Sequence, residues 1–365
     1  MTTIQIDKAP AQGLEATGLD EKLERLDEIL GSMGGTVLIG YSGGVDSAML
    51  AVAAHRVLGK RAIAVTADSE SYADGELERA VEIVEQFGIL HEVVHTREID
   101  NPDYASNPIN RCYFCKSELF IHMGKLAEKH QATAILYGQN ADDVGDFRPG
   151  AQAAKDYGVR APLQEAGLNK QDVRALAKQW GLPVWNRPAM ACLSSRFPYG
   201  TPVTAQGLRM VDRAESFVRK MGFEQLRVRH HSDIARIELP PDKLNHLLGN
   251  AELTDKLYNE LITLGYGLVA VDLRGFRSGS LNEVLTKGTS GDADAILVAQ
   301  KVLEGSGFLG TAAKQIDQML IVKVATHDFM RFADENQRNN LVQQLQASGM
   351  QYMALDLASA THTTA

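Results

Sequence analysis

The sequence predicts an α/β protein whose main part is a doubly wound parallel sheet. Short apolar runs suited to buried strands lie at 36–41, 61–68, 91–96 and 132–138. Stretches with helical periodicity separate these runs. Strands that alternate with helices are typical of a parallel sheet covered on both faces, and ligands of such sheets bind at the carboxyl ends of the strands.

The predicted helices follow from the spacing of apolar residues and from their end signals. The stretch 74–88, for example, gathers its apolar residues on one face, with Asp74 as a candidate N-cap and Gly88 as a stop. We expect helices over about 20–32, from the glycine turn to about 58, and over 74–88, 116–130 and 170–181.

The pattern changes after about residue 200. A helix is expected over 205–221, a hairpin over 224–239, a helix over 241–264 and a strand over 267–273. The last stretch is expected to be mostly helical and shows no motif or internal repeat. The predicted organisation is therefore a loose arm (1–19), a nucleotide-binding domain (20–200), a smaller α+β domain (201–285) and a helical C-terminal extension of unknown role (286–365).

Composition limits the class of protein. Of 365 residues, 44% are hydrophobic and 23% charged, as in ordinary globular proteins. No apolar run approaches the roughly 20 residues that span a membrane, and the N-terminus lacks the pattern of a signal peptide, so we expect a cytoplasmic protein. The net charge of −9 argues against a nucleic-acid substrate.

The glycine turn after the first strand reads SGGVDS. Gly43 and Gly44 permit unusual backbone angles, and their N–H groups with the following helix N-terminus can bind phosphate. Ser42 and Ser47 add hydroxyl donors, and Asp46 is a candidate Mg²⁺ ligand. The turn lacks the lysine of a Walker loop and the third glycine of a dinucleotide fingerprint. The alternative is a plain strand-to-helix turn with a serine cap.

The full string resembles the PP-loop of the ATP pyrophosphatase superfamily, whose fold is the adenine nucleotide α-hydrolase type. This resemblance implies that ATP binds through its β,γ-pyrophosphate, adenylates an acceptor oxygen and releases pyrophosphate. GQNADD, at the end of the fourth strand, fits a second layer around the triphosphate or its metal, with Asn140, Asp142 and Asp143 as candidates. The alternative for these three is a polar loop.

The chain has only three cysteines, too few for a disulfide framework. Cys112 and Cys115 form a CxxC at a helix start, which can chelate a metal, act as a redox pair or arise by chance. Cys192 can supply a third ligand. Because ordinary structural [4Fe–4S] clusters have four cysteine ligands, a three-cysteine site points to a functional cluster with one open iron. Three unrelated cysteines are the alternative.

Five segments together resemble the LarE family of ATP-dependent sulfur transferases: SGGVDSAML, NRCYFCK, GQNADDVGDFRPG, ACLSSRFPYGTPVT and DLRGFRSGSLNE. The resemblance covers about residues 20–285. It implies adenylation of a carboxylate of pyridinium-3,5-biscarboxylic acid mononucleotide and its conversion to a thiocarboxylate for a nickel-pincer cofactor. Some members use a sacrificial cysteine that becomes dehydroalanine, whereas others carry three cysteines and a [4Fe–4S] cluster. Cys112 places this chain with the second type.

The hairpin supports an anionic substrate. Its apolar residues alternate with Arg227, Arg229, Arg236 and Glu238, which then share the opposite face, while His230 points to the core. A solvated face with an ion pair is the alternative. The resemblance implies a substrate phosphate site at Arg227 and Arg229, metal-binding carboxylates at Glu215 and Glu238, and active-site roles beside the sulfur for Ser195 and Arg196.

Other hypotheses stay open. Cys192 can be a single-use sulfur donor in the same reaction. Another PP-loop enzyme, a tRNA thiolase or an amidotransferase synthetase, is possible, although the former should be basic and the latter needs a glutaminase. A non-enzymatic, ATP-binding redox sensor is the fourth hypothesis. The family resemblance also implies a homo-oligomer, with a small molecule as substrate and neither nucleic acid nor membrane as partner.

Overall fold

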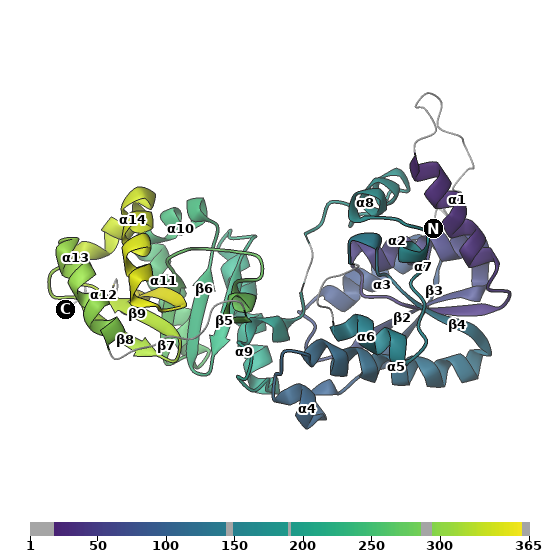
Figure 1. Cartoon of the computed structure of the whole chain (residues 1–365), viewed down its shortest axis with the longest axis horizontal. Coiled ribbons are helices and arrows are strands. Elements are labelled where there is room, and N and C mark those ends of the chain that lie inside the picture. Colours follow the sequence, from purple (N-terminus) through teal and green to yellow (C-terminus); the bar gives the residue numbers. More distant parts are fainter. Residues whose placement is uncertain (1–17, 144–148, 189–190, 286–293, 360–365) are drawn as a thin grey trace. The chain divides into compact units, whose positions relative to one another are not determined.

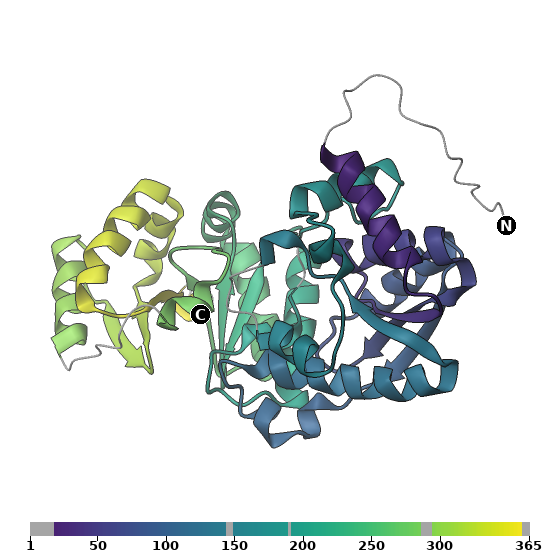
Figure 2. The ribbon, with the colours of Figure 1, turned by 45° about the vertical axis from the view of Figure 1, so that its right-hand side comes forward.

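The structure is a computed structural model that describes residues 18–143, 149–188, 191–285 and 294–359 (Figures 1 and 2). The chain forms two compact units, the first ending at Cys192 and the second beginning at Leu193. The expected N-terminal arm lies almost wholly outside the described residues. The first helix, α1 (Gly18–Gly31), begins just after it.

Unit 1 is built on a four-stranded parallel sheet, as the alternation of strands and helices predicts. Its order is β3-β2-β1-β4, so the chain starts in the middle of the sheet and crosses to both sides. The four predicted strands are confirmed as β1 (Thr36–Gly40), β2 (Ala62–Asp68), β3 (Leu90–His95) and β4 (Ala132–Tyr137).

Helices cover both faces of this sheet. On β1, Val37 and Ile39 pack into the core shared with α1, α2, α3 and α8, whereas Leu38 packs toward α5 and α6. This alternation is the period-two consequence of a strand buried on both faces. The remaining helices of unit 1 are α2 (Val45–Leu58), α3 (Glu76–Gln86), α4 (Pro102–Ala105), α5 (Arg111–His130), α6 (Pro149–Asp156), α7 (Pro162–Glu165) and α8 (Lys170–Gln179).

Unit 2 is built on a six-stranded mixed sheet of order β5-β6-β7-β10-β9-β8. The strands are β5 (Arg227–His231), β6 (Ile234–Glu238), β7 (Leu268–Asp272), β8 (Ala312–Ile316), β9 (Met319–Lys323) and β10 (Tyr352–Asp356). The helices are α9 (Ala205–Lys220), α10 (Pro241–Leu248), α11 (Ala251–Thr263), α12 (Asp294–Gly305), α13 (Thr326–Phe329) and α14 (Glu335–Leu345). Apolar residues from all six helices join one core on one face of the sheet.

The predicted hairpin is confirmed as β5 and β6, with Arg229 opposite Arg236 and Arg227 opposite Glu238. Val228 and Ile237 enter the helix-covered core, so the charged residues lie on the opposite face. That face is charged on β5 and β6 and apolar on β9 and β10, where Met319, Ile321, Tyr352 and Ala354 form a small cluster.

The C-terminal part differs from the expected separate extension. Helices α12 and α14 are present as expected, but β8, β9 and β10 belong to the same sheet as the hairpin, with β10 paired to β7. This stretch also repeats the order of elements of residues 205–272, a repeat that the sequence did not reveal. The reason is that the two copies share apolar positions and turn geometry rather than identical residues.

Candidate active site

The PP-loop joins β1 to α2 and is held by its own side chains. Ser47 Oγ donates to the Gly44 carbonyl at 3.1 Å and accepts from the Ser42 N–H at 3.1 Å. Gly43 has φ of 71°, and a Cβ there would lie 3.1 Å from Ala80 of α3. Ser42, Gly43 and Gly44 line a cavity, whereas the buried Ser47 shapes the loop.

Asp46, on the first turn of α2, is the carboxylate of this loop. Asn140, which follows β4, donates from Nδ2 to Asp46 Oδ1 at 3.1 Å. Lys170, the first residue of α8, forms an ion pair with the other oxygen. Asn140 and Asp46 were both predicted as site residues. Lys170 was missed, because nothing in its local sequence separates it from other lysines that begin a helix.

Asp142 and Asp143 support these groups. Asp143 accepts the Asn140 backbone N–H at 3.1 Å, and Asp142 accepts that of Lys170 at 2.9 Å. Neither aspartate lines the cavity. In this structure they hold the segments that carry Asn140 and Lys170, rather than facing the space where a triphosphate would lie.

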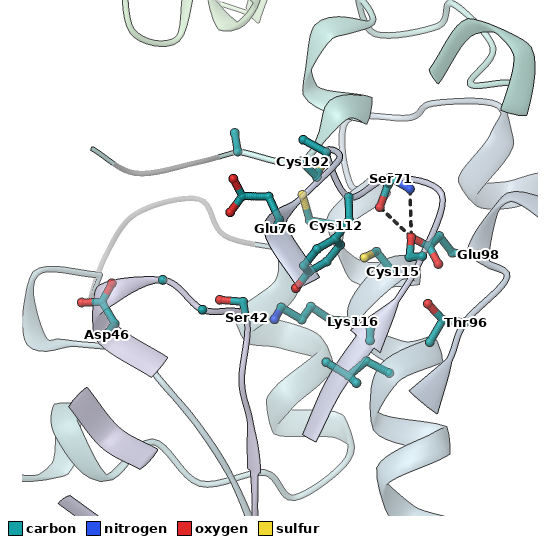
Figure 3. Close-up of a pocket in the computed structure, with 18 of the residues that line it drawn as sticks. Ser42, Asp46, Ser71, Glu76, Thr96, Glu98, Cys112, Cys115, Lys116 and Cys192 are labelled. Atoms are coloured by element: carbon teal, nitrogen blue, oxygen red, sulfur yellow. Dashed lines mark hydrogen bonds between the residues drawn. The ribbon is translucent and has the colours of Figure 1, made fainter. Parts of the chain in front are cut away.

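The same cavity, of about 400 Å³, is lined by all three cysteines (Figure 3). Cys112 and Cys115 come from the first turns of α5, and Cys192 from the end of unit 1. All three lie in the described part of the chain, and none forms a disulfide. The phosphate-binding loop and the sulfur-bearing residues, far apart in sequence, therefore share one cavity within unit 1.

Glu98 and two serines form a polar group beside Cys115. The Oγ atoms of Ser69 and Ser71 both donate to Glu98 Oε1, that of Ser71 at 2.8 Å. Burial, followed by the charges of Glu98 and Cys192, raises the pKa of the Cys115 thiol. The thiol therefore needs a nearby cation or a metal to ionise at neutral pH.

The cavity also holds cations that sequence reasoning missed. Arg111, Lys116, Lys170 and Arg187 line it. Arg187 donates two hydrogen bonds to Glu76, at 2.6 and 3.2 Å. Burial raises the pKa of this carboxyl, but the hydrogen bonds and charges of Arg187 and Arg79 together outweigh burial and lower the pKa. Because ligands of such sheets bind at the carboxyl ends of the strands, the segments after β2 and β3 could have been predicted to line the cavity. This rule does not indicate Arg187.

In unit 2, Arg196 and Glu215 form a buried pair. Arg196 donates from Nε and Nη2 to the two oxygens of Glu215, each at 2.9 Å, and both side chains are at most 1% exposed. Burial alone would raise the pKa of Glu215, but Arg196, Arg219 and the Val228 N–H together outweigh burial, and the pKa lies below its usual value. Arg196 also donates to the Ser195 hydroxyl at 3.0 Å.

A second buried network links the hairpin to β7. Arg229 donates to Glu238 Oε2 at 2.8 and 3.0 Å and to the Ser195 carbonyl at 3.0 Å. Arg236 donates to Glu238 Oε1 at 2.9 Å and pairs with Asp272. Both oxygens of Glu238 therefore already accept from arginines.

Arg227, on β5 of this hairpin, has side-chain donors to spare. Within the described residues its one side-chain hydrogen bond goes to the Leu226 carbonyl. Burial, followed by the charge of Arg196, lowers the pKa of Arg227 to about 10. An anion beside Arg227 would relieve this excess of positive charge.

A metal centre is not preformed. In the part of the chain that the structure describes, no group of three or more His, Cys, Asp or Glu side chains is arranged for a metal ion. Glu215 and Glu238 offer a divalent cation no oxygen that is not already bonded to arginine. The three cysteines share a cavity but do not stand at ligand spacing.

Similarities to known proteins support the assignment of the PP-loop. A protein-family model described as NAD synthase matches residues 21–107, which contain the PP-loop. The glutamine-hydrolysing GMP synthase of Aeropyrum pernix is 28% identical over 202 residues, 49% of this chain and 38% of that protein. An uncharacterized protein of Synechocystis sp. is 46% identical over 269 residues, 74% of this chain and the whole of that protein.

A further relative decides the family. The pyridinium-3,5-bisthiocarboxylic acid mononucleotide synthase of Lactiplantibacillus plantarum is 38% identical over 252 residues, 69% of this chain and 90% of that protein. This chain belongs to the LarE family. As a LarE-family member with a PP-loop, it is an ATP-dependent sulfur transferase that uses ATP with Mg²⁺. Within the described ranges of this LarE-family chain, no helix is long and apolar enough to cross a bilayer.

Proposed function

We propose that this enzyme converts the carboxylates of pyridinium-3,5-biscarboxylic acid mononucleotide to thiocarboxylates. One observation carries the proposal: the PP-loop and the three cysteines line one cavity. An enzyme that first adenylates a carboxylate and then displaces AMP with sulfur needs both groups near one carbon atom. The name of the Lactiplantibacillus relative supports the choice of substrate.

In the first step, the loop holds the leaving group. The N–H groups at Gly43 and Gly44 and the N-terminus of α2 would bind the β,γ-phosphates of ATP. Asp46 would hold the Mg²⁺ that accompanies ATP and offsets charge on its phosphates. A substrate carboxylate oxygen attacks the α-phosphorus, the bond to the β-phosphate oxygen breaks, and pyrophosphate leaves.

In the second step, sulfur attacks the carbonyl carbon of the acyl adenylate. The bond from this carbon to the bridging oxygen breaks, and AMP leaves with the former carboxylate oxygen. Lys116 and Arg187, which line the cavity, would stabilise the negative charge of the departing AMP. In unit 2, Arg227 and Arg229 are the proposed ligands of the substrate phosphate, and Arg227 has the unused donors for it.

For the source of sulfur, we propose a [4Fe–4S] cluster held by Cys112, Cys115 and Cys192. Three thiols facing one cavity suit iron chemically, although they would have to move to ligand spacing. When bound, the cluster would supply sulfide at an iron without a protein ligand. The alternative is that the Cys192 thiolate attacks the adenylate and its Cβ–S bond then breaks by elimination, leaving dehydroalanine.

The test is iron and acid-labile sulfide content of protein purified without oxygen, with the visible spectrum. About four irons per chain in the wild type would support the cluster, provided that Cys112→Ser loses both the iron and repeated turnover. Absence of iron after reconstitution, with a chain lighter by one H₂S after a single turnover, supports Cys192 as donor. Failure to release pyrophosphate with the biscarboxylate would overturn the proposed substrate.

We also propose that the enzyme is a homo-oligomer, as the family resemblance implies.

A further inference from the structure

Unit 2 contains two copies of one supersecondary unit. The N-terminal repeat (205–272) runs α9-β5-β6-α10-α11-β7, and the C-terminal repeat (294–356) runs α12-β8-β9-α13-α14-β10. β5 and β8 start at residues 227 and 312, and β6 and β9 at 234 and 319, both 85 residues apart. β7 and β10 start at 268 and 352, 84 residues apart. One deletion, before α14, therefore aligns the strands of the two repeats.

Turns and core positions agree at the same offsets. The hairpin turns both place a non-glycine residue at positive φ, Ser232 at 58° and Asp317 at 50°. Phe223 and Phe308 are both buried. The two repeats also end alike, because Asp272 accepts the Arg274 N–H at 2.8 Å and Asp356 accepts the Ala358 N–H at 3.0 Å. Such agreement in detail indicates a duplicated unit.

The repeats meet as two identical subunits would. β7 and β10 pair antiparallel, with Val271 opposite Leu355 at the centre. Asp272 pairs with Ala354, and their counterparts Asp356 and Ala270 also pair. A pairing that is unchanged when the copies are exchanged is the defining property of an isologous two-fold interface.

The copies differ in charge. The positions of Arg229, Arg236 and Glu238 are taken in the C-terminal repeat by Lys314, Ile321 and Lys323. Among the described residues, these three positions of the C-terminal repeat therefore do not reproduce the buried arginine–carboxylate network.

The C-terminal repeat nevertheless contacts that network. The Tyr352 ring lies under the Arg236 guanidinium, 4.1 Å from its carbon, and 5.5 Å from the His231 ring. The Gln351 carbonyl accepts from Arg274 Nη2 at 2.9 Å. The counterpart of Tyr352 in the N-terminal repeat is Leu268, which cannot make a cation–π contact.

We propose that the C-terminal repeat is a built-in partner subunit. It covers the edge of β7 in place of a second copy of this chain, and through Tyr352 it positions Arg236 and thereby the Glu238–Arg229 pair. About a quarter of this chain, more than the length of one repeat, has no counterpart in the 269-residue Synechocystis relative. An open β-edge is a template for self-association, so a single-repeat chain would have to protect this strand in another way.

The positioning role has a kinetic test, which rests on the proposed function. Tyr352→Leu gives the C-terminal repeat the residue that the N-terminal repeat has at the equivalent position, Leu268. We expect the KM for the mononucleotide to rise about fivefold or more, with kcat and the KM for ATP unchanged, and Tyr352→Phe to restore the wild-type KM. Met319→Ala is the control, since it removes bulk from the same apolar cluster but leaves the Tyr352 ring present. An unchanged KM in Tyr352→Leu, with active wild type, would overturn the inference, whereas inactive wild type would overturn the proposed function.

The covering of β7 has a second test in the full-length chain. Under mild oxidation, Val271→Cys with Leu355→Cys should form a disulfide within one chain, because the two residues face each other across the pair. Val271→Cys alone should give no disulfide between residues 271 of two chains. Peptide mapping reads out both bonds and separates them from those of the native cysteines. A 271–271 bond in the single variant would show that β7 pairs between chains, contrary to the proposal.

Discussion

Lys170, at the start of α8, forms an ion pair with Asp46 on the first turn of α2. Asn140, after β4, bonds the other oxygen of the same carboxylate. Three segments far apart in sequence thus fix one acidic group beside the phosphate-binding loop. Its charge is balanced by Lys170 in this structure, and MgATP would change that balance.

Lys170→Met should therefore weaken the use of ATP. The variant loses both the partner of Asp46 and a cation of the cavity, so we expect kcat/KM for ATP to fall by about 10–100-fold. ATP–pyrophosphate exchange measures this effect directly. Lys155→Met, an exposed lysine of α6, is the control and should match the wild type. Equal exchange rates in the two variants would show that Lys170 has no part in ATP binding.

A physical difference separates the site residues that were predicted from those that were missed. Ser42, Gly43, Gly44 and Asp46 were predicted because phosphate binding needs a local backbone pattern that sequence displays directly. Lys170 and Arg187 were missed because their roles depend on long-range packing that no local pattern records.

The same division applies to the fold. The parallel sheet of unit 1 was predicted because β1, β2 and β4 are largely apolar runs and because helical stretches separate all four strands. The strands β8 to β10 were missed because β8 alternates weakly and is half exposed, and because β10 pairs with β7 across about 80 residues of chain. The repeat in unit 2 was hidden because only its burial pattern and turns were retained.

Gly138→Ala should disturb the PP-loop by close contact. A Cβ on Gly138 would lie 2.7 Å from the Ser47 nitrogen and 2.9 Å from the Asp46 carbonyl carbon. Since backbone cannot give way cheaply, we expect a loss of about 1–3 kcal/mol in free energy of unfolding, with reduced ATP–pyrophosphate exchange. Gly124→Ala, inside α5 with nothing within 4 Å of the new Cβ, should instead stabilise by roughly 0.5–1 kcal/mol. Denaturant unfolding of both variants distinguishes a steric clash at residue 138 from a general effect of replacing glycine.

Glu215→Gln should destabilise unit 2 strongly. The change leaves Arg196 buried without its charged partner, which costs about 3–5 kcal/mol. Because the folded pKa of Glu215 lies below its unfolded value, its contribution is present above the unfolded pKa and is lost as pH falls through the folded pKa. The difference between wild type and variant should therefore shrink in acid. Glu224→Gln, an exposed control nearby in sequence, should show neither the loss nor the pH dependence. A Glu215→Gln variant as stable as wild type at pH 7 would contradict this account.

His230 should make stability fall between pH 6.5 and 4. It is 7% exposed, contacts the Tyr266 hydroxyl at 3.3 Å and lies against the Phe197 ring, and burial lowers its pKa to about 4. Above pH 6.5 the imidazole is neutral in both folded and unfolded chains, so it adds no pH dependence. Between 6.5 and 4 the unfolded chain binds the proton first, and the free energy of unfolding declines by up to about 3 kcal/mol, a loss that is complete below the folded pKa.

His230→Phe cannot bind the proton, so subtracting its pH–stability curve from that of the wild type isolates the effect of this one residue. Parallel curves for wild type and His230→Phe over this range would show that His230 titrates alike in both states.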